Sequence, residues 1–165
     1  MTSDFSQMKI EQVVKAVVSE IKNEGYEDMT LDFALELIKG VEEEARRIGV
    51  NAVVAVVSRG ANPVAVHCMD NSYIASYDIA FNKAFTVVSL KMPTTKLKEL
   101  AQPGKDLYGI QFTNNGRIVI FGGGEPLVAN GTVIGGLGVS GGSEEQDTYL
   151  AKYGEKLFKE AIRKI

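Results

Sequence analysis

The sequence of 165 residues contains no tryptophan, one cysteine, one histidine and four prolines. A single cysteine excludes an internal disulfide and favours a reducing compartment, so we expect a cytoplasmic protein. One histidine and one cysteine are too few ligands for a zinc site built from such residues. His67 and Cys68 are adjacent in a predicted strand. Their side chains therefore point to opposite faces and cannot form a catalytic dyad.

Long apolar runs and an excess of basic residues are also missing. No segment approaches the roughly 18 consecutive apolar residues of a membrane span. The start of the chain, with Asp4 and Gln7, lacks the pattern of a signal peptide. The net charge is -3, which gives no electrostatic footprint for nucleic acid. We therefore expect neither a membrane nor a nucleic acid as partner, and the composition and length fit one globular domain.

The spacing of apolar residues predicts several helices. The first has a narrow aliphatic stripe and ends near Gly25, so residues 1–25 form a separable segment. Thr30 is a candidate N-cap for the second, and the third is apolar on nearly all sides, which is typical of a central helix. The predicted helices cover residues 10–25, 30–49, 73–91, 94–101 and 143–165.

Short apolar segments between turn signals predict five strands. Asn115-Gly116 and Asn130-Gly131 are typical of tight hairpin turns. The predicted strands cover residues 51–58, 63–69, 117–121, 126–129 and 132–140. Because hairpins dominate, we predict an α/β (α+β) fold in which an antiparallel sheet of about five strands is flanked by helices.

Nine of the 17 glycines lie between Gly122 and Gly142, and the run from Gly136 to Gly141 matches the pattern G-x-G-x-x-G. A dinucleotide site also needs a further parallel strand, and no residues remain for one. Three acids in the first turn after Ser143 would repel a pyrophosphate. Ser143 and Gln146 instead form a predicted capping box. The strand glycines indicate the close approach of a packed helix or of a ligand, and both alternatives stay open.

Few side chains suggest chemistry. His67 and Met69 share a predicted strand face, and either could supply one axial ligand to a haem, although His67 also fits a half-buried structural role. Asp70 is a candidate helix N-cap or site residue. Lys83, in an otherwise apolar helix, is the best cationic anchor for a pocket. No paired acid and base is evident.

Four elements, in order, carry a resemblance to a known family. The run from Asp78 to Thr86 resembles "D-I-A-x-x-K-A-x-T", and Met69-Asp70 resembles "R-M-D" with Cys68 in place of the arginine. The other two elements are the run Phe121–Leu127 and the run Gly138–Gly142 with Gln146-Asp147. Together they resemble the GlcG/HbpS-like family, which includes the C-terminal domain of PduO-type cobalamin adenosyltransferases.

The resemblance implies that residues 26–165 form one domain with a profilin/PAS-like layered arrangement. It also implies homo-oligomers, often octamers, and the binding of haem or a corrinoid in some members. Residues 1–25 resemble the N-terminal helices that direct cargo into bacterial microcompartments. A helix with such a stripe can dock on a shell or cargo protein, on its own domain, across an oligomer interface or on a membrane surface.

Our leading hypothesis is an accessory protein that binds haem, a corrinoid or a small metabolite, inside or outside a microcompartment. One alternative is a small enzyme acting on an aldehyde, diol or hydroxy acid, with Lys83 and either Asp78 or Glu145 transferring protons. Another is a purely structural assembly protein. The predicted ligand-binding residues are His67, Met69, Asp70, Lys83, Thr86, Gly122, Gly123, Gly124, Glu125, Glu145 and Asp147, with no catalytic residue and no metal site other than His67 as haem ligand.

Overall fold

The computed structural model describes residues 28–163, so the predicted N-terminal helix and residues 1–25 lie outside the described residues. The elements are α2 (Leu31–Arg47), β1 (Val53–Ser58), β2 (Pro63–Cys68), α3 (Ser76–Leu90), α4 (Thr94–Leu100), two 3-10 turns (Ile110–Phe112 and Asn114–Gly116), β3 (Gly124–Ala129), β4 (Thr132–Ser140) and α5 (Glu144–Arg163). No helix between residues 28 and 163 has the length and apolar character to cross a membrane.

The four strands form one antiparallel sheet in the order β2-β1-β4-β3. The predicted α/β fold with an antiparallel sheet is confirmed, but the predicted number of about five strands is wrong. Residues 117–121 follow a 3-10 turn instead of a hairpin and pair with no strand. The backbone N–H of Val119 donates to the Thr86 hydroxyl at 3.0 Å, so a side chain on α3 replaces a strand partner.

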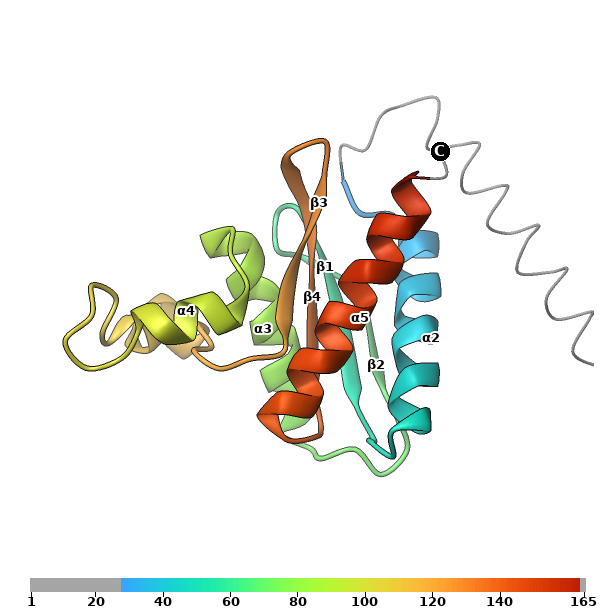
Figure 1. Ribbon diagram of the computed structural model, residues 1–165, viewed down its shortest axis with the longest axis horizontal. Coiled ribbons are helices and arrows are strands. Elements are labelled where there is room, and N and C mark those ends of the chain that lie inside the picture. Colours follow the sequence, from blue (N-terminus) through green and yellow to red (C-terminus); the bar gives the residue numbers. More distant parts are fainter. Residues whose placement is uncertain (1–27, 164–165) are drawn as a thin grey trace, which may run out of the picture.

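Helices cover both faces of the sheet. Figure 1 shows α2 and α5 side by side on one face and α3 on the other. Val54 and Val56 of β1 pack toward α2 and α5, whereas Val53 and Ala55 pack toward α3. Because both faces are buried, this strand is uniformly apolar instead of alternating with polar residues.

Helix α3 lies against the backbone of β4. A Cβ added to Gly138 would stand 2.0 Å from the carbonyl oxygen of Ala80, and one added to Gly136 would stand 2.5 Å from that of Ala84. No side chain fits between these two backbones. Gly136 and Gly138 therefore serve the packed helix, which decides between the two alternatives at these two positions.

Two of the three helix caps predicted from the sequence are present in the structure. The Thr30 hydroxyl accepts a hydrogen bond from the Phe33 N–H at 3.3 Å, which confirms that N-cap. The capping box is also confirmed, since the Gln146 N–H donates to the Ser143 hydroxyl at 3.2 Å and the Ser143 N–H donates to Gln146 at 2.9 Å. Asp70 as an N-cap is wrong, because the loop continues to Ala75 before α3 begins.

Candidate functional site

The predicted site residues concentrate at one end of the sheet, where β2 and β4 end and β1 and β3 begin. Val53 pairs with both Cys68 and Ser140, and Gly124 pairs with Gly138. The segments that lead into β1 and β3 and those that follow β2 and β4 therefore meet at this end. They form two separate groups of polar residues, one beside β3 and β4 and one beside β1 and β2.

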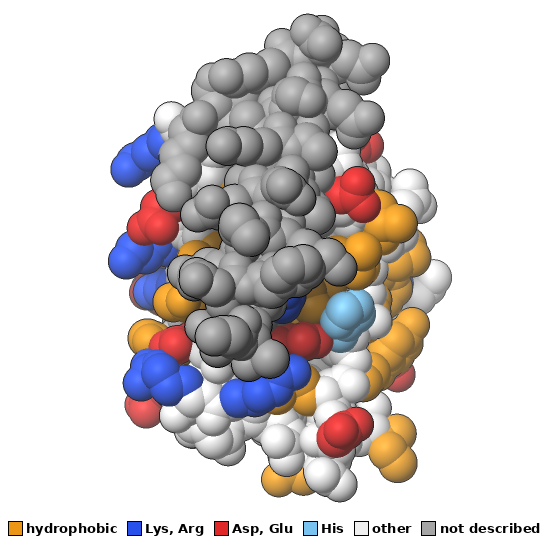
Figure 2. All heavy atoms as spheres, turned by 90° about the vertical axis from the view of Figure 1, so that its right-hand side faces the viewer, with side chains coloured by type: hydrophobic (Ala, Val, Ile, Leu, Met, Phe, Trp, Pro, Cys, Tyr) orange, Lys and Arg blue, Asp and Glu red, His pale blue; other side chains and the backbone are white. Residues whose placement is uncertain are grey.

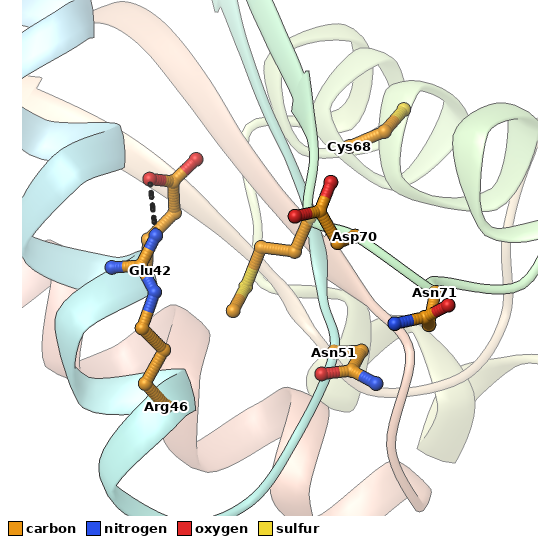
Figure 3. Close-up of a pocket in the computed structure, with 7 residues that line it drawn as sticks. Glu42, Arg46, Asn51, Cys68, Asp70 and Asn71 are labelled. Carbon is orange, nitrogen blue, oxygen red and sulfur yellow. Dashed lines mark hydrogen bonds and ion pairs between the residues drawn. The ribbon is translucent and has the colours of Figure 1, made fainter.

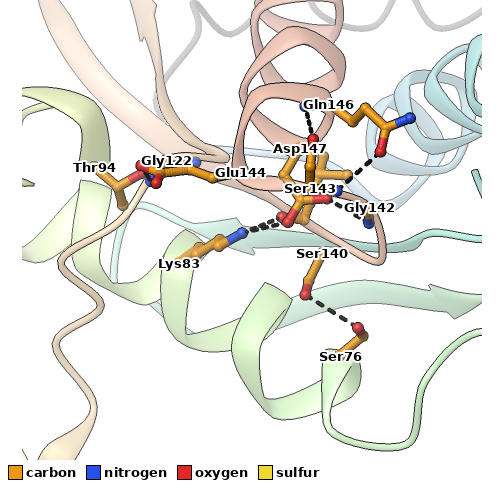
Figure 4. Close-up of polar contacts among 12 residues, drawn as sticks. Ser76, Lys83, Thr94, Gly122, Ser140, Gly142, Ser143, Glu144, Gln146 and Asp147 are labelled. Carbon is orange, nitrogen blue, oxygen red and sulfur yellow. Dashed lines mark hydrogen bonds and ion pairs between the residues drawn. The ribbon is translucent and has the colours of Figure 1, made fainter.

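The first group is built around Lys83, which is completely buried. Its Nζ donates to the carbonyl oxygen of Val139 at 2.8 Å and to the Asp147 carboxylate at 2.8 Å (Figure 4). The ring of Phe121 lies 4.9 Å from the same nitrogen and forms a cation–π contact. Gly123 leaves the room for this arrangement, because a Cβ there would stand 2.6 Å from Nζ.

Lys83 thus reaches from α3 past the end of the sheet to α5 on the opposite face. Asp147 also accepts a hydrogen bond from the Gly142 N–H at 2.9 Å, which fixes the start of α5. Burial lowers the pKa of the Lys83 ammonium, and the adjacent Asp147 carboxylate opposes part of that shift. The carboxylate that pairs with Lys83 is Asp147, whereas Asp78 and Glu145 are exposed. The contacts of Nζ fit a structural ion pair that ties the two helices together.

A second set of contacts joins α4 to the same corner. The Glu144 carboxylate accepts hydrogen bonds from Lys98 at 2.7 Å and from the Gly122 N–H at 2.8 Å. The Lys98 hydrogen bond, followed by that of Gly122, lowers the pKa of Glu144. The Gly124 N–H donates to the Thr94 hydroxyl at 3.0 Å. The roles of Thr94, Lys98 and Glu144 could not be predicted from the sequence, because the chain gives no signal that α4 folds back onto the glycines.

Three further predicted residues, Thr86, Glu145 and Glu125, lie outside both groups of polar residues. The Thr86 hydroxyl bonds to the backbone of Asn82 and Val119 and holds the 117–121 segment. Glu145 is exposed. Glu125 lies on the opposite face of the sheet among the residues of α5 and is 4% exposed. Burial raises the pKa of Glu125 to about 7, and the nearby Glu155 carboxylate adds to the shift.

The second group surrounds an open hollow of about 330 Å³ at the ends of β1 and β2 (Figure 3). Its lining residues are Glu42, Arg46, Asn51, Cys68, Met69, Asp70 and Asn71. Met69 and Asp70 belong to the predicted set. Glu42 and Arg46 were missed, because their spacing of four residues on a charged helix is typical of a solvated face.

His67 lies beside this hollow on the edge strand β2. Its Nδ1 is 2.9 Å from Oε1 of Glu42, and Oε2 of Glu42 is 3.4 Å from the guanidinium of Arg46. The His67 side chain is 43% exposed, and the only histidine of the chain is visible on this face of the molecule (Figure 2). Within residues 28–163, no three His, Cys, Asp or Glu side chains are grouped so as to hold a metal ion.

These features define a class of small α/β domains. An antiparallel sheet carries two helices on one face and one deeply packed helix on the other, and a buried lysine closes its glycine-rich end. The family model described as "Haem degrading protein HbpS-like" matches residues 29–156, and the chain belongs to this HbpS-like family.

Two curated relatives illustrate the similarity. A Citrobacter freundii protein described as "Uncharacterized 15.0 kDa protein in dhaT-dhaS intergenic region" is 43% identical, with 84% of this chain and 98% of that protein aligned. The Salmonella typhimurium corrinoid adenosyltransferase PduO is 38% identical over 71% of this chain. The match covers 35% of PduO, so this chain corresponds to about a third of that enzyme.

Solved structures show the same fold. The Klebsiella pneumoniae protein ORFY is 44% identical, with a TM-score of 0.78 over 79% of this chain and 90% of that one. A structure described as a PduOC:heme complex is 34% identical, with a TM-score of 0.75 over 78% of this chain and 94% of that one. HbpS is 28% identical with a TM-score of 0.70, over 79% of this chain and 89% of that one.

Replacing Lys83 by methionine should destabilise the protein strongly, because it leaves Asp147 buried without its partner. We expect a loss of about 3–5 kcal/mol in the free energy of unfolding, measured by urea denaturation. The double variant Lys83→Met/Asp147→Leu should recover part of that loss. The control is Lys159→Met, which removes an exposed pair with Glu155 and should cost less than about 1 kcal/mol. A loss in Lys83→Met no larger than in the control would contradict the structural role of the pair.

Glu125 should make stability depend on pH. Its folded pKa of about 7 lies above the ordinary value of 4.5, so the folded state keeps a proton that the unfolded state has lost between these values. The free energy of unfolding should therefore fall as pH rises from about 4.5 to 7. Glu125→Gln should equal the parent protein at pH 4 and exceed it by about 1–2 kcal/mol at pH 8. Glu145→Gln, at an exposed position, is the control, and parallel stability curves for Glu125→Gln and the parent would refute the assignment.

Proposed function

We propose that this protein is an accessory binding protein for haem or a related tetrapyrrole, with His67 as the protein ligand to the metal. The contact of His67 with Glu42 is the observation that carries the proposal. A carboxylate that accepts from Nδ1–H fixes the neutral imidazole with its free lone pair on Nε2, which is the arrangement of metal-binding histidines. The similarity to a protein solved with haem supports the choice of ligand.

The His67 side chain is partly exposed, so a macrocycle bound to it would lie on the surface. The adjacent hollow, at about 330 Å³, is at the small end of ligand pockets, and most of its lining is polar. Bound haem would supply an iron with an open position for a nitrogen ligand, and a corrinoid would supply a cobalt in the same way.

Large exposed apolar side chains support a homo-oligomer, with the octamer as the expected assembly. Ile74 is 96% exposed and Phe112 is 82% exposed, which is unusual for large apolar side chains of a monomer. The glycine-rich corner fits the alternative of a purely packing role and is not part of the proposed tetrapyrrole site.

We further propose that the protein is cargo of a bacterial microcompartment and that residues 1–25 direct it there. The support is the aliphatic stripe of that segment and the similarity of the chain to PduO proteins. Shell proteins or other cargo proteins would be the partners.

Titration of the purified protein with haemin should shift the Soret band with a Kd in the micromolar range. His67→Ala should weaken the binding at least about tenfold, because it removes the nitrogen ligand. Cys68→Ser is the matched control, since Cys68 follows His67 in the chain but points to the other face of β2. Titration with cobalamin distinguishes the two kinds of ring. Unchanged spectra with both ligands, or full haemin binding by His67→Ala, would overturn the proposal.

Residues 1–25 fused to a fluorescent protein should relocate the reporter to the shells of cells that form microcompartments. The control is the same fusion with Val13 and Val17 replaced by glutamate, which disrupts the aliphatic stripe of the predicted helix. A diffuse signal from the unaltered fusion would count against the targeting role.

A further inference from the structure

The hollow beside His67 contains polar groups that the proposed tetrapyrrole site does not use. Within residues 28–163, the side chains of Asn51, Asp70 and Asn71 take part in no hydrogen bond or ion pair. Arg46 is held by a single contact with Glu42, at 3.4 Å, and its side chain is 59% exposed. Two carboxylates line the hollow. Glu42 is already engaged by His67 and Arg46, whereas the Asp70 carboxylate, the two amides and the remaining donors of the Arg46 guanidinium are available to a ligand.

The backbone around the hollow is fixed by hydrogen bonds. The Met69 N–H donates to the Ala52 carbonyl at 3.0 Å, and the Ala52 N–H donates to the sulfur of Met69 at 3.3 Å. The Ser72 N–H donates to the Met69 carbonyl at 3.0 Å and closes the turn that carries Asp70 and Asn71. A ligand would therefore meet walls that are already in place, which lowers the entropic cost of binding.

The charges are separated across the hollow. Figure 3 shows Arg46 on α2 and, on the opposite side, Asp70 and Asn71 from the loop after β2 together with Asn51 from the segment before β1. A dianion would be repelled by both Asp70 and Glu42, and a neutral polyol would gain no charge interaction from Arg46. A molecule that carries both a carboxylate and an ammonium group matches both sides.

Size narrows the ligand further. At about 330 Å³ the hollow has the volume of roughly ten water molecules, which suits a molecule of six to twelve heavy atoms. The thioether of Met69 provides an apolar contact for a short side chain.

We propose that this hollow binds a free α-amino acid. Its carboxylate pairs with Arg46, its ammonium group pairs with Asp70, and the amides of Asn51 and Asn71 complete the hydrogen bonds. The amino acid site can be tested in the protein without a tetrapyrrole at His67.

The proposal is tested by two-dimensional NMR and calorimetry on the full-length protein with glycine, L-alanine, L-serine and L-methionine. At least one amino acid should bind with a Kd below about 1 mM and shift the amide signals of the residues that line the hollow. Lactate, which lacks the ammonium group, and ethanolamine, which lacks the carboxylate, should bind at least about tenfold more weakly.

Variants of the two charged walls complete the test. Arg46→Gln and Asp70→Asn should each weaken amino acid binding at least about tenfold, whereas Glu155→Gln and Lys159→Gln, which alter an exposed ion pair on α5, should leave it unchanged. Arg46→Lys, which keeps the charge, should retain part of the affinity and excludes an effect of misfolding. The absence of shifts with all four amino acids at 10 mM, equal binding of lactate, or undiminished binding by Asp70→Asn would overturn the proposal.

Discussion

The direct contact between the backbone of α3 and the backbone of β4 sets the arrangement of the rest of the domain. At Gly138 the two chains approach so closely that even a methyl group would stand 2.0 Å from the Ala80 carbonyl oxygen. Because α3 packs directly on the backbone of β4, the side chain of Lys83 is buried at the end of the sheet. A buried ammonium requires an opposite charge, and α5 supplies it from the other face through Asp147.

The glycines thus have two separate tasks. Gly136 and Gly138 of β4 admit the helix α3, whereas Gly122 to Gly124 form the corner around which α3, α4 and α5 meet. Gly122 and Gly124 donate backbone hydrogen bonds to Glu144 and Thr94, so the corner is held by its neighbours. This corner is closed, and its polar groups are paired with one another. The open polar groups lie at the other side of the same sheet end, beside β1 and β2.

Periodicity and turn signals were sufficient to predict the helices α2 to α5, four of the strands and the antiparallel pairing. The strand expected at residues 117–121 is absent because Thr86 provides the hydrogen bond that a neighbouring strand would otherwise give, and no local pattern reveals such a partner. The importance of Lys83 was predictable, since a lysine in an apolar helix needs compensation. Its pairing with Asp147 was not, because the two residues are 64 positions apart and reach each other around the end of the sheet.

The contribution of α2 to the open hollow was hidden for a different reason. Charged residues on an exposed helix look alike in a sequence, whether they face only water or the wall of a cavity. Glu42 differs from the other charged residues of α2 because it contacts His67 on the edge strand β2. The topology of the sheet places that strand beside α2, and the sequence does not reveal this. The family resemblance indicated the fold correctly, but it gave no indication of these two helix residues.

Glu42 uses one oxygen for His67 and the other for Arg46, so a single carboxylate stands between the proposed metal ligand and the proposed amino acid site. A ligand that draws Arg46 away leaves more negative charge on Glu42 to support the imidazole. By thermodynamic reciprocity, occupancy of His67 must change the affinity of the hollow by the same factor. The two proposed sites would then be allosterically coupled without any movement of the sheet.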